Sequence, residues 1–158
     1  MLKILGYAAS LLVPLTGYTT TIELDTYLGG HQTQLDGKPA LSFIFSHNAK
    51  LNNETSGSGS SSNNCSIITT DQYLRQSKGR LENINLTEPN FYFDCEWEGK
   101  FYMLSNLYRT YAEVIVKTPD ENFPMSIHIE AKLVTLSGER LEVISGDIPL
   151  NSESERVW

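Results

Sequence analysis

The clearest alternation of hydrophobic and polar positions runs through Phe91–Trp97. Its odd positions are Phe, Phe, Cys and Trp, and its even positions are Tyr, Asp and Glu. Side chains of an extended chain alternate between two faces, so this spacing predicts a strand with one buried face. Glu98-Gly99-Lys100 predicts a turn, and residues 101–104 predict a returning strand. We expect the remaining strands to be added to this central hairpin.

The same alternation recurs along the chain. Met125 to Leu133 is the longest clean run, and Thr20 to Leu28 forms a second one. Gly29-Gly30 predicts the end of that strand, with a polar loop over residues 31–39 that holds an Asp36-Gly37 turn signal. Thr70 or Asp71 can cap a short helix over residues 71–77. Further strands are expected at 41–46, 65–69, 81–86, 112–117 and 141–148.

Seven to nine short strands with turns between them and almost no helix predict an all-β fold. An antiparallel β-sandwich is the expected architecture, and a small β-barrel is the alternative. The 158 residues fit a single domain with one core, which we place at residues 20–150. Residues 151–158 are predicted to be a C-terminal tail.

The stretch Asn52–Asn64 has no apolar residue and cannot bury enough surface to offset its ordering entropy. A domain boundary there would leave too few residues before it for a separate core. It therefore predicts a flexible polar loop inside the domain. Such a loop is either a tolerated surface insertion or a segment that orders on a partner.

The first residues resemble an export signal, with Lys3 followed by an apolar run from Ile4 to Leu15. We interpret residues 1–19 as an export signal or an N-terminal anchor. Leu15-Thr16-Gly17 resembles a bacterial lipobox, which favours a bacterial or phage source. Tyr18 stands where that motif places the lipidated cysteine, so thioether lipidation at this position is impossible.

The number of cysteines bears on the cellular compartment, and the net charge bears on the class of binding partner. Cys65 and Cys95 are an even pair, which in an exported protein predicts a disulfide; two free thiols in a cytosolic protein are the alternative. The formal charge of −7 argues against nucleic acid as a partner and against electrostatic docking on anionic headgroups. We expect membrane contact only through the N-terminal segment, if it is not cleaved.

No strong catalytic motif is present. None of His31, His47 and His128 has metal-ligand spacing, so neither a metal nor another cofactor is predicted. Asp94 and Glu96 share a strand face, and paired carboxylates can hydrolyse glycosides, although two on one strand are also typical of a solvated sheet face. The sequence predicts a noncatalytic protein, with a small carbohydrate-acting enzyme as an alternative.

Aromatic side chains supply the candidate binding residues. Tyrosine gives contact area at low entropy cost, while packing in the sheet is the other role of tyrosine in strands. The candidate interaction surface consists of four tyrosines on or near the central hairpin: Tyr92, Tyr102, Tyr108 and Tyr111.

Two segments carry family likenesses. Asp36-Gly37-Lys38-Pro39 before an apolar strand resembles the outer-membrane lipoprotein of type VI secretion systems, also a β-sandwich. Residues 93–101 resemble the cysteine-containing hairpin of periplasmic lysozyme inhibitors. The export signal, the β architecture, the flexible polar loop and the absence of a catalytic motif together predict an exported interaction module of the periplasm or outer membrane that binds another envelope protein. The likeness to the secretion lipoprotein implies, as a finer form of this expectation, a lipoprotein-like component of an envelope or secretion assembly. An inhibitor or immunity-type protein that blocks a partner enzyme is the alternative.

Overall fold

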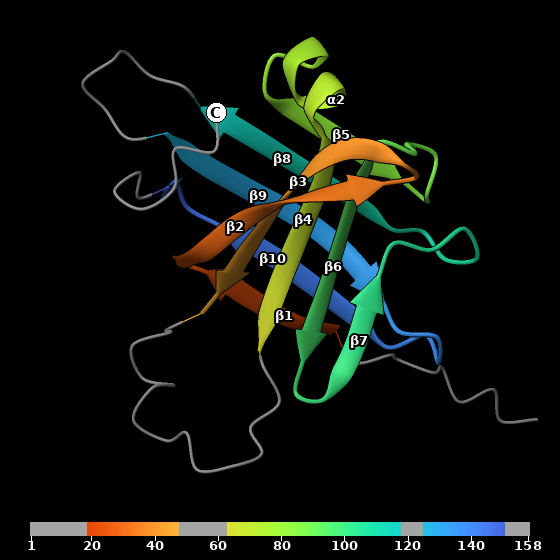
Figure 1. Ribbon diagram of the computed structural model, residues 1–158. Coiled ribbons are helices and arrows are strands. Elements are labelled where there is room, and N and C mark those ends of the chain that lie inside the picture. Colours follow the sequence, from red (N-terminus) through yellow and green to blue (C-terminus); the bar gives the residue numbers. More distant parts are fainter. Residues whose placement is uncertain (1–18, 48–62, 118–124, 151–158) are drawn as a thin grey trace, which may run out of the picture.

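The computed structural model describes residues 19–47, 63–117 and 125–150 (Figure 1). Most of the predicted export segment, residues 52–62 of the polar loop and the tail at 151–158 lie outside these residues. Within them the chain forms eleven strands and one short helix, so the all-β prediction is confirmed. The first strand begins at Thr19, the last residue of the predicted export segment.

One half of the sheet contains both cysteines, and we call it the disulfide half. It has five strands, each antiparallel to its neighbours, in the spatial order β2-β3-β4-β6-β7. Their bounds are Thr26–Leu35 (β2), Lys38–Ser46 (β3), Asn64–Thr70 (β4), Phe91–Trp97 (β6) and Lys100–Met103 (β7).

The other half has the order β5-β8-β9-β10-β1, and we call it the ion-pair half. The outermost pair, β1 with β10, is parallel, which departs from the predicted antiparallel arrangement. The bounds are Arg80–Ile84 (β5), Tyr111–Lys117 (β8), Ser126–Val134 (β9), Arg140–Ser145 (β10) and Thr19–Leu24 (β1), with Ile148–Pro149 (β11) also paired to β9.

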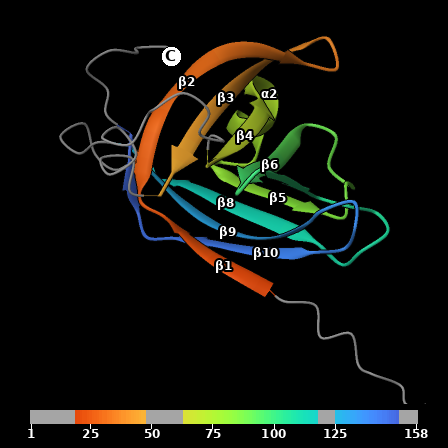
Figure 2. The ribbon, with the colours of Figure 1, turned by 90° about the horizontal axis from the view of Figure 1, so that it is seen from below.

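The two halves belong to one continuous sheet. They are joined by the Met103–Val134 pair between β7 and β9. The chain passes between the halves several times, first at Asp25 between β1 and β2. Figure 2 shows the resulting half-barrel, with β2, β3 and β4 facing β8, β9 and β10. The architecture thus combines the opposed layers of the expected sandwich with the curled sheet of the barrel alternative.

The core fills the space between the two halves. Every second side chain of each strand points into this space. The disulfide half contributes most of the buried phenylalanines, and the ion-pair half contributes mainly aliphatic side chains. The largest fully buried side chains include Phe45, Phe91, Phe93, Ile129, Leu133 and Leu141.

The helix α2, Asp71–Gln76, adds Leu74 to this core. The Thr70 side chain accepts a hydrogen bond of 3.2 Å from the Tyr73 backbone N–H. This is the N-cap predicted from the sequence, because a threonine oxygen satisfies a backbone donor that the first helical turn leaves unpaired.

The predicted strand end at Gly29-Gly30 and the predicted loop at 31–39 are wrong. The strand β2 continues through the two glycines with a shift of register after Tyr27, and it pairs with β3 up to the Asp36-Gly37 turn. A Cβ on Gly30 would lie 2.6 Å from the Ser42 carbonyl oxygen, so glycine permits the close approach of two strands. The strand β2 lies at the edge of the sheet and pairs only with β3 there. Its polar side chains can remain in contact with solvent while its backbone pairs, which is why the polar sequence did not prevent a strand.

Candidate functional site

Cys65 and Cys95 occupy opposite positions on β4 and β6. Their sulfur atoms are 2.09 Å apart, the distance of a disulfide bond, and both residues are fully buried. The predicted pairing therefore agrees with the fold. Both side chains point into the core, so the outward face of these strands is formed by their neighbours in sequence.

Four apolar side chains lie close together on that outward face of the disulfide half, among serine, threonine and acidic positions. Ile44, Ser66, Asp94 and Met103 form one row across β3, β4, β6 and β7, and the pair Ile68–Tyr92 lies beside it. All six are half-buried, and we call them the half-buried face. Its composition suits contact with another macromolecule, since interface centres are depleted in charge.

Asp94 is the one charged residue of the half-buried face. The Ser66 hydroxyl donates a 2.8 Å hydrogen bond to it, and no cation contributes to its electrostatic environment. Burial raises the pKa of Asp94, and the Ser66 hydrogen bond offsets part of that rise. Glu96, two positions further along β6, is exposed. The two predicted carboxylates thus share a strand face but differ in environment.

The four predicted tyrosines lie in different parts of the molecule. Tyr102 is 5% exposed and packs in the core, whereas Tyr92 belongs to the half-buried face. Tyr108 lies in the segment between β7 and β8. Tyr111 lies on the outward face of the ion-pair half, where its hydroxyl donates a 2.6 Å hydrogen bond to Glu130. Only Tyr92 therefore lies beside Asp94.

The hydrogen bond to Glu130 and burial raise the pKa of Tyr111 to about 12. Both effects favour the neutral phenol. Ionisation would remove the hydrogen bond to Glu130 and place a second negative charge beside its carboxylate, and burial disfavours any charged form. Tyr111 is therefore a hydrogen-bond donor throughout the physiological range.

The outward face of the ion-pair half pairs its charges internally. Arg80 contacts both Glu82 and Glu113, and the amine of Lys132 lies 2.8 Å from Glu142. The Arg80–Glu82 contact lies within β5, whereas Arg80–Glu113 and Lys132–Glu142 cross neighbouring strands, as expected for side-chain pairs on a solvated sheet.

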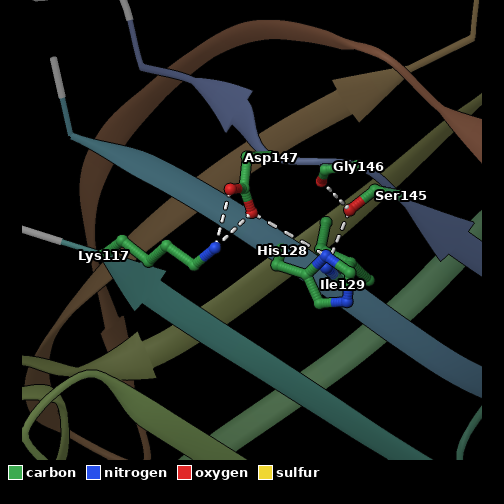
Figure 3. A network of polar contacts seen from close by, with 6 residues as sticks. All are labelled: Lys117, His128, Ile129, Ser145, Gly146 and Asp147. Atoms are coloured by element: carbon green, nitrogen blue, oxygen red, sulfur yellow. Dashed lines mark hydrogen bonds and ion pairs between the residues drawn. The ribbon is translucent and has the colours of Figure 1, made fainter.

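Figure 3 shows a further pair at the end of β8, where Lys117 approaches Asp147 at 2.6 Å and His128 lies 3.9 Å from the same carboxylate. The Ser145 hydroxyl accepts a hydrogen bond from the Ile129 N–H and donates one to the Gly146 carbonyl, which holds the turn that carries Asp147.

The other two histidines considered from the sequence, His31 and His47, lie away from His128 and from each other. His47 lies 2.7 Å from the Glu23 carbonyl oxygen, at the crossing between the halves, and His31 lies on β2. Among the residues with described positions, no cluster of three or more histidine, cysteine or acidic side chains could hold a metal ion. No helix in those ranges is long and apolar enough to span a bilayer.

Two asparagines that organise the loops were not singled out from the sequence. Asn83 is buried and donates to the Phe91 and Glu88 carbonyls, and Asn85 accepts a 2.7 Å hydrogen bond from the Thr110 N–H. The signal available was the position of both at a strand end shortly before Pro89-Asn90, where asparagine often satisfies turn backbone.

Comparison with known protein families, curated proteins and solved structures gave no match for this chain.

Proposed function

We propose that this protein is an exported, noncatalytic interaction module that binds another envelope protein through the half-buried face. The observation that carries the proposal is the composition of that face. Ile44, Ile68, Tyr92 and Met103 remain partly accessible around a single carboxylate. An apolar patch around one half-buried polar residue is typical of a recognition surface.

Export is supported by two independent features. Lys3 and the apolar run to Leu15 resemble a signal segment. The cysteine pair at disulfide distance fits an oxidising compartment, because cytosolic thiols are kept reduced. A lipoprotein-like role in an envelope or secretion assembly is the finer form of the proposal, with the protein in the periplasm or at the outer membrane.

An inhibitor or immunity-type role is the second candidate. The polar stretch 52–64 connects β3 to β4, and its last residue, Asn64, lies opposite Glu96 in the row next to Asp94. The strand residues on either side of this connection, Ser46 and Asn64, lie opposite each other beside the half-buried face, which supports a role of the stretch in extending the contact. Deletion of residues 52–62 would abolish binding if the loop blocks a partner enzyme, and would leave it unchanged if the face alone binds.

A photoreactive amino acid at position 92 in the native host tests the binding face. A matched probe at Ile115 reports on the outward face of the ion-pair half, where it is also half-buried. We expect one discrete cross-linked partner from position 92 and none from 115. Tyr92→Lys should then weaken binding of the purified partner at least about thirtyfold, as for a central aromatic anchor, with Ile115→Lys as the control. Equal cross-linking or equal weakening at both positions would refute this face.

Cell fractionation with intact-mass measurement tests export separately. We expect the protein outside the cytoplasm with the mass deficit of one disulfide. An intact Met1 terminus in the cytoplasm with both thiols open to alkylation would contradict it. Ala substitutions at Asp94 and Glu96 distinguish the enzyme alternative, because turnover of a glycan substrate would be lost only if these carboxylates are catalytic.

A further inference from the structure

Three turns at one end of the molecule expose large apolar side chains. They are residues 84–87 at the end of β5, 104–110 between β7 and β8, and 135–140 around the β9–β10 turn; together we call them the leucine end. Leu107 is 86% exposed and Leu136 is 87% exposed. Figures 1 and 2 both show these turns at the same end of the sheet. Ile84, Leu86 and Tyr108 add further exposed apolar surface.

The turns are held by specific contacts. Asn85 Oδ1 accepts hydrogen bonds from the backbone and the hydroxyl of Thr110, which connects the first two turns. The Thr110 hydroxyl also accepts a 2.9 Å hydrogen bond from the Ser105 N–H. A Cβ on Gly138 would lie 3.2 Å from the Tyr108 hydroxyl, so Tyr108 rests on the third turn. The exposed leucines are therefore presented by preorganised turns.

Folding stability does not account for the apolar side chains of these turns. Leu86 has a φ of 58°, in the left-handed region that disfavours a leucine and favours glycine or asparagine. Leu107 and Leu136 each expose most of their surface and bury little on folding. Apolar residues at such positions are typical of a contact with something outside the chain.

Two arginines flank the exposed leucines. Arg109 and Arg140 are exposed, and neither guanidinium forms an ion pair with another residue in the described ranges. Glu139 is engaged by Lys100, and Glu88 accepts hydrogen bonds from Asn90. Because Asn90 is neutral and leaves the charge of Glu88 in place, the two arginines exceed this carboxylate by one positive charge, although the whole chain carries −7. Screening over roughly 8–10 Å leaves local charges to decide contact with a surface.

The chain reaches the described fold at this same end. Thr19, the first residue of β1, pairs with Arg140, which closes the β9–β10 turn. The apolar run from Ile4 to Leu15 precedes it in sequence. If that run enters a bilayer, either as an export signal before cleavage or as an anchor, the leucine end is the part of the fold nearest to the membrane.

We propose that the leucine end docks on a bilayer surface that carries anionic headgroups. Leu107 and Leu136 enter the interfacial region, and Arg109 and Arg140 contact the phosphates. Apolar insertion combined with cationic contacts is how peripheral segments bind anionic membranes. The half-buried face belongs to the other half of the sheet, so this inference stands or falls independently of the partner-binding proposal.

Vesicle partition of the purified full chain tests the inference. The probes are vesicles of phosphatidylcholine alone and of phosphatidylcholine with phosphatidylglycerol. Leu107→Asp with Leu136→Asp should lower the partition coefficient about tenfold per leucine, since each loses interfacial burial. Arg109→Gln with Arg140→Gln should lower it about fivefold per arginine on anionic vesicles only. Leu28→Asp, at an exposed leucine of β2, is the matched control and should change nothing.

Hydrogen exchange of the vesicle-bound chain gives a second readout that the N-terminal segment does not dominate. Amides of residues 105–109 and 135–139 should exchange more slowly on anionic vesicles, and the Glu98-Gly99 turn should not. Unchanged partition of the leucine variant together with unprotected turns would overturn the inference. A solution dimer that the leucine variant converts to monomer, with vesicle partition unchanged, would instead assign this end to a second copy of the chain and would also overturn it.

Discussion

The two halves of the sheet treat their outward positions differently. In the disulfide half, Asp94 lies among apolar neighbours with only the Ser66 hydroxyl as a hydrogen-bond partner, and its pKa is raised by burial. In the ion-pair half, carboxylates meet cations across neighbouring strands, as Glu142 meets Lys132. The same alternation therefore produces one outward face with ion pairs inside the chain and one on which half-buried Asp94 has no cation beside it.

The halves also differ in how their strands are linked. The pair Cys65–Cys95 joins the neighbouring strands β4 and β6 of the disulfide half, while the ion-pair half relies on aliphatic packing and hydrogen bonds. Because both halves enclose one core, we expect a change in either half to alter the stability of the whole domain.

The largest expected effect comes from removing the disulfide. Cys65→Ser with Cys95→Ser should lower the free energy of unfolding by about 3 to 4 kcal/mol, because the 30-residue separation no longer restricts the unfolded chain. Urea denaturation followed by circular dichroism measures it. We expect one cooperative transition in both the parent and the variant. Two separate transitions would show that the two halves unfold independently and do not form a single domain.

Neutralising the carboxylate of the half-buried face should stabilise the protein. Asp94→Asn retains an acceptor for Ser66 and removes a charge whose pKa is raised by burial, so we expect a gain of about 1 kcal/mol at neutral pH. The raised folded pKa means that protonation favours the native state. The difference between variant and parent should therefore vanish below the unfolded pKa of about 4 and should grow as the pH rises through the folded pKa.

Thermal unfolding at a series of pH values measures this gain. Glu96→Gln is the matched control because Glu96 lies on the same strand but is exposed. If Asp94→Asn instead destabilised the protein at neutral pH, the charge of Asp94 would be stabilised by its surroundings, which would contradict the conclusion that no cation lies beside it.

A smaller effect is expected on the opposite face. Lys132→Met should lower stability by about 0.5 kcal/mol at low ionic strength and by much less in concentrated salt, since the pair with Glu142 is partly exposed. The contact with Lys132 lowers the pKa of Glu142, so its stabilisation is present above the unfolded pKa and is lost as the pH falls through the folded one. A double-mutant cycle with Glu142→Gln measures the coupling free energy of this pair. A coupling free energy that does not change with salt concentration would argue against an ion pair between Lys132 and Glu142.

The smallest effect concerns Tyr111. Its pKa of about 12 places its ionisation beyond that of an ordinary tyrosine, so a spectrophotometric titration should lose its latest phase in Tyr111→Phe. The hydrogen bond to Glu130 should stabilise the fold below about pH 10 and cease to do so as the pH rises through 12. An unchanged titration would mean that the hydrogen bond to Glu130 does not raise the pKa of Tyr111.

Local patterns predicted much of this fold. Alternation in Phe91–Trp97 and after Met125 identified buried strand faces, because burial of every second side chain is a property of a single strand. Asp36-Gly37 and Glu98-Gly99 identified turns, since both residues of each pair adopt the positive φ that such hairpins require. The cysteine pair followed from its number and from the expected compartment.

Other features depend on which strands become neighbours, which alternation along one strand does not encode. The parallel pairing of β1 with β10, the continuation of β2 through Gly30, and the half-barrel all arise from contacts between distant segments. The candidate site is of this second kind. The row Ile44, Ser66, Asp94 and Met103 comes from four strands, and its half-buried state follows from cross-strand register, because register brings separate side chains onto one face.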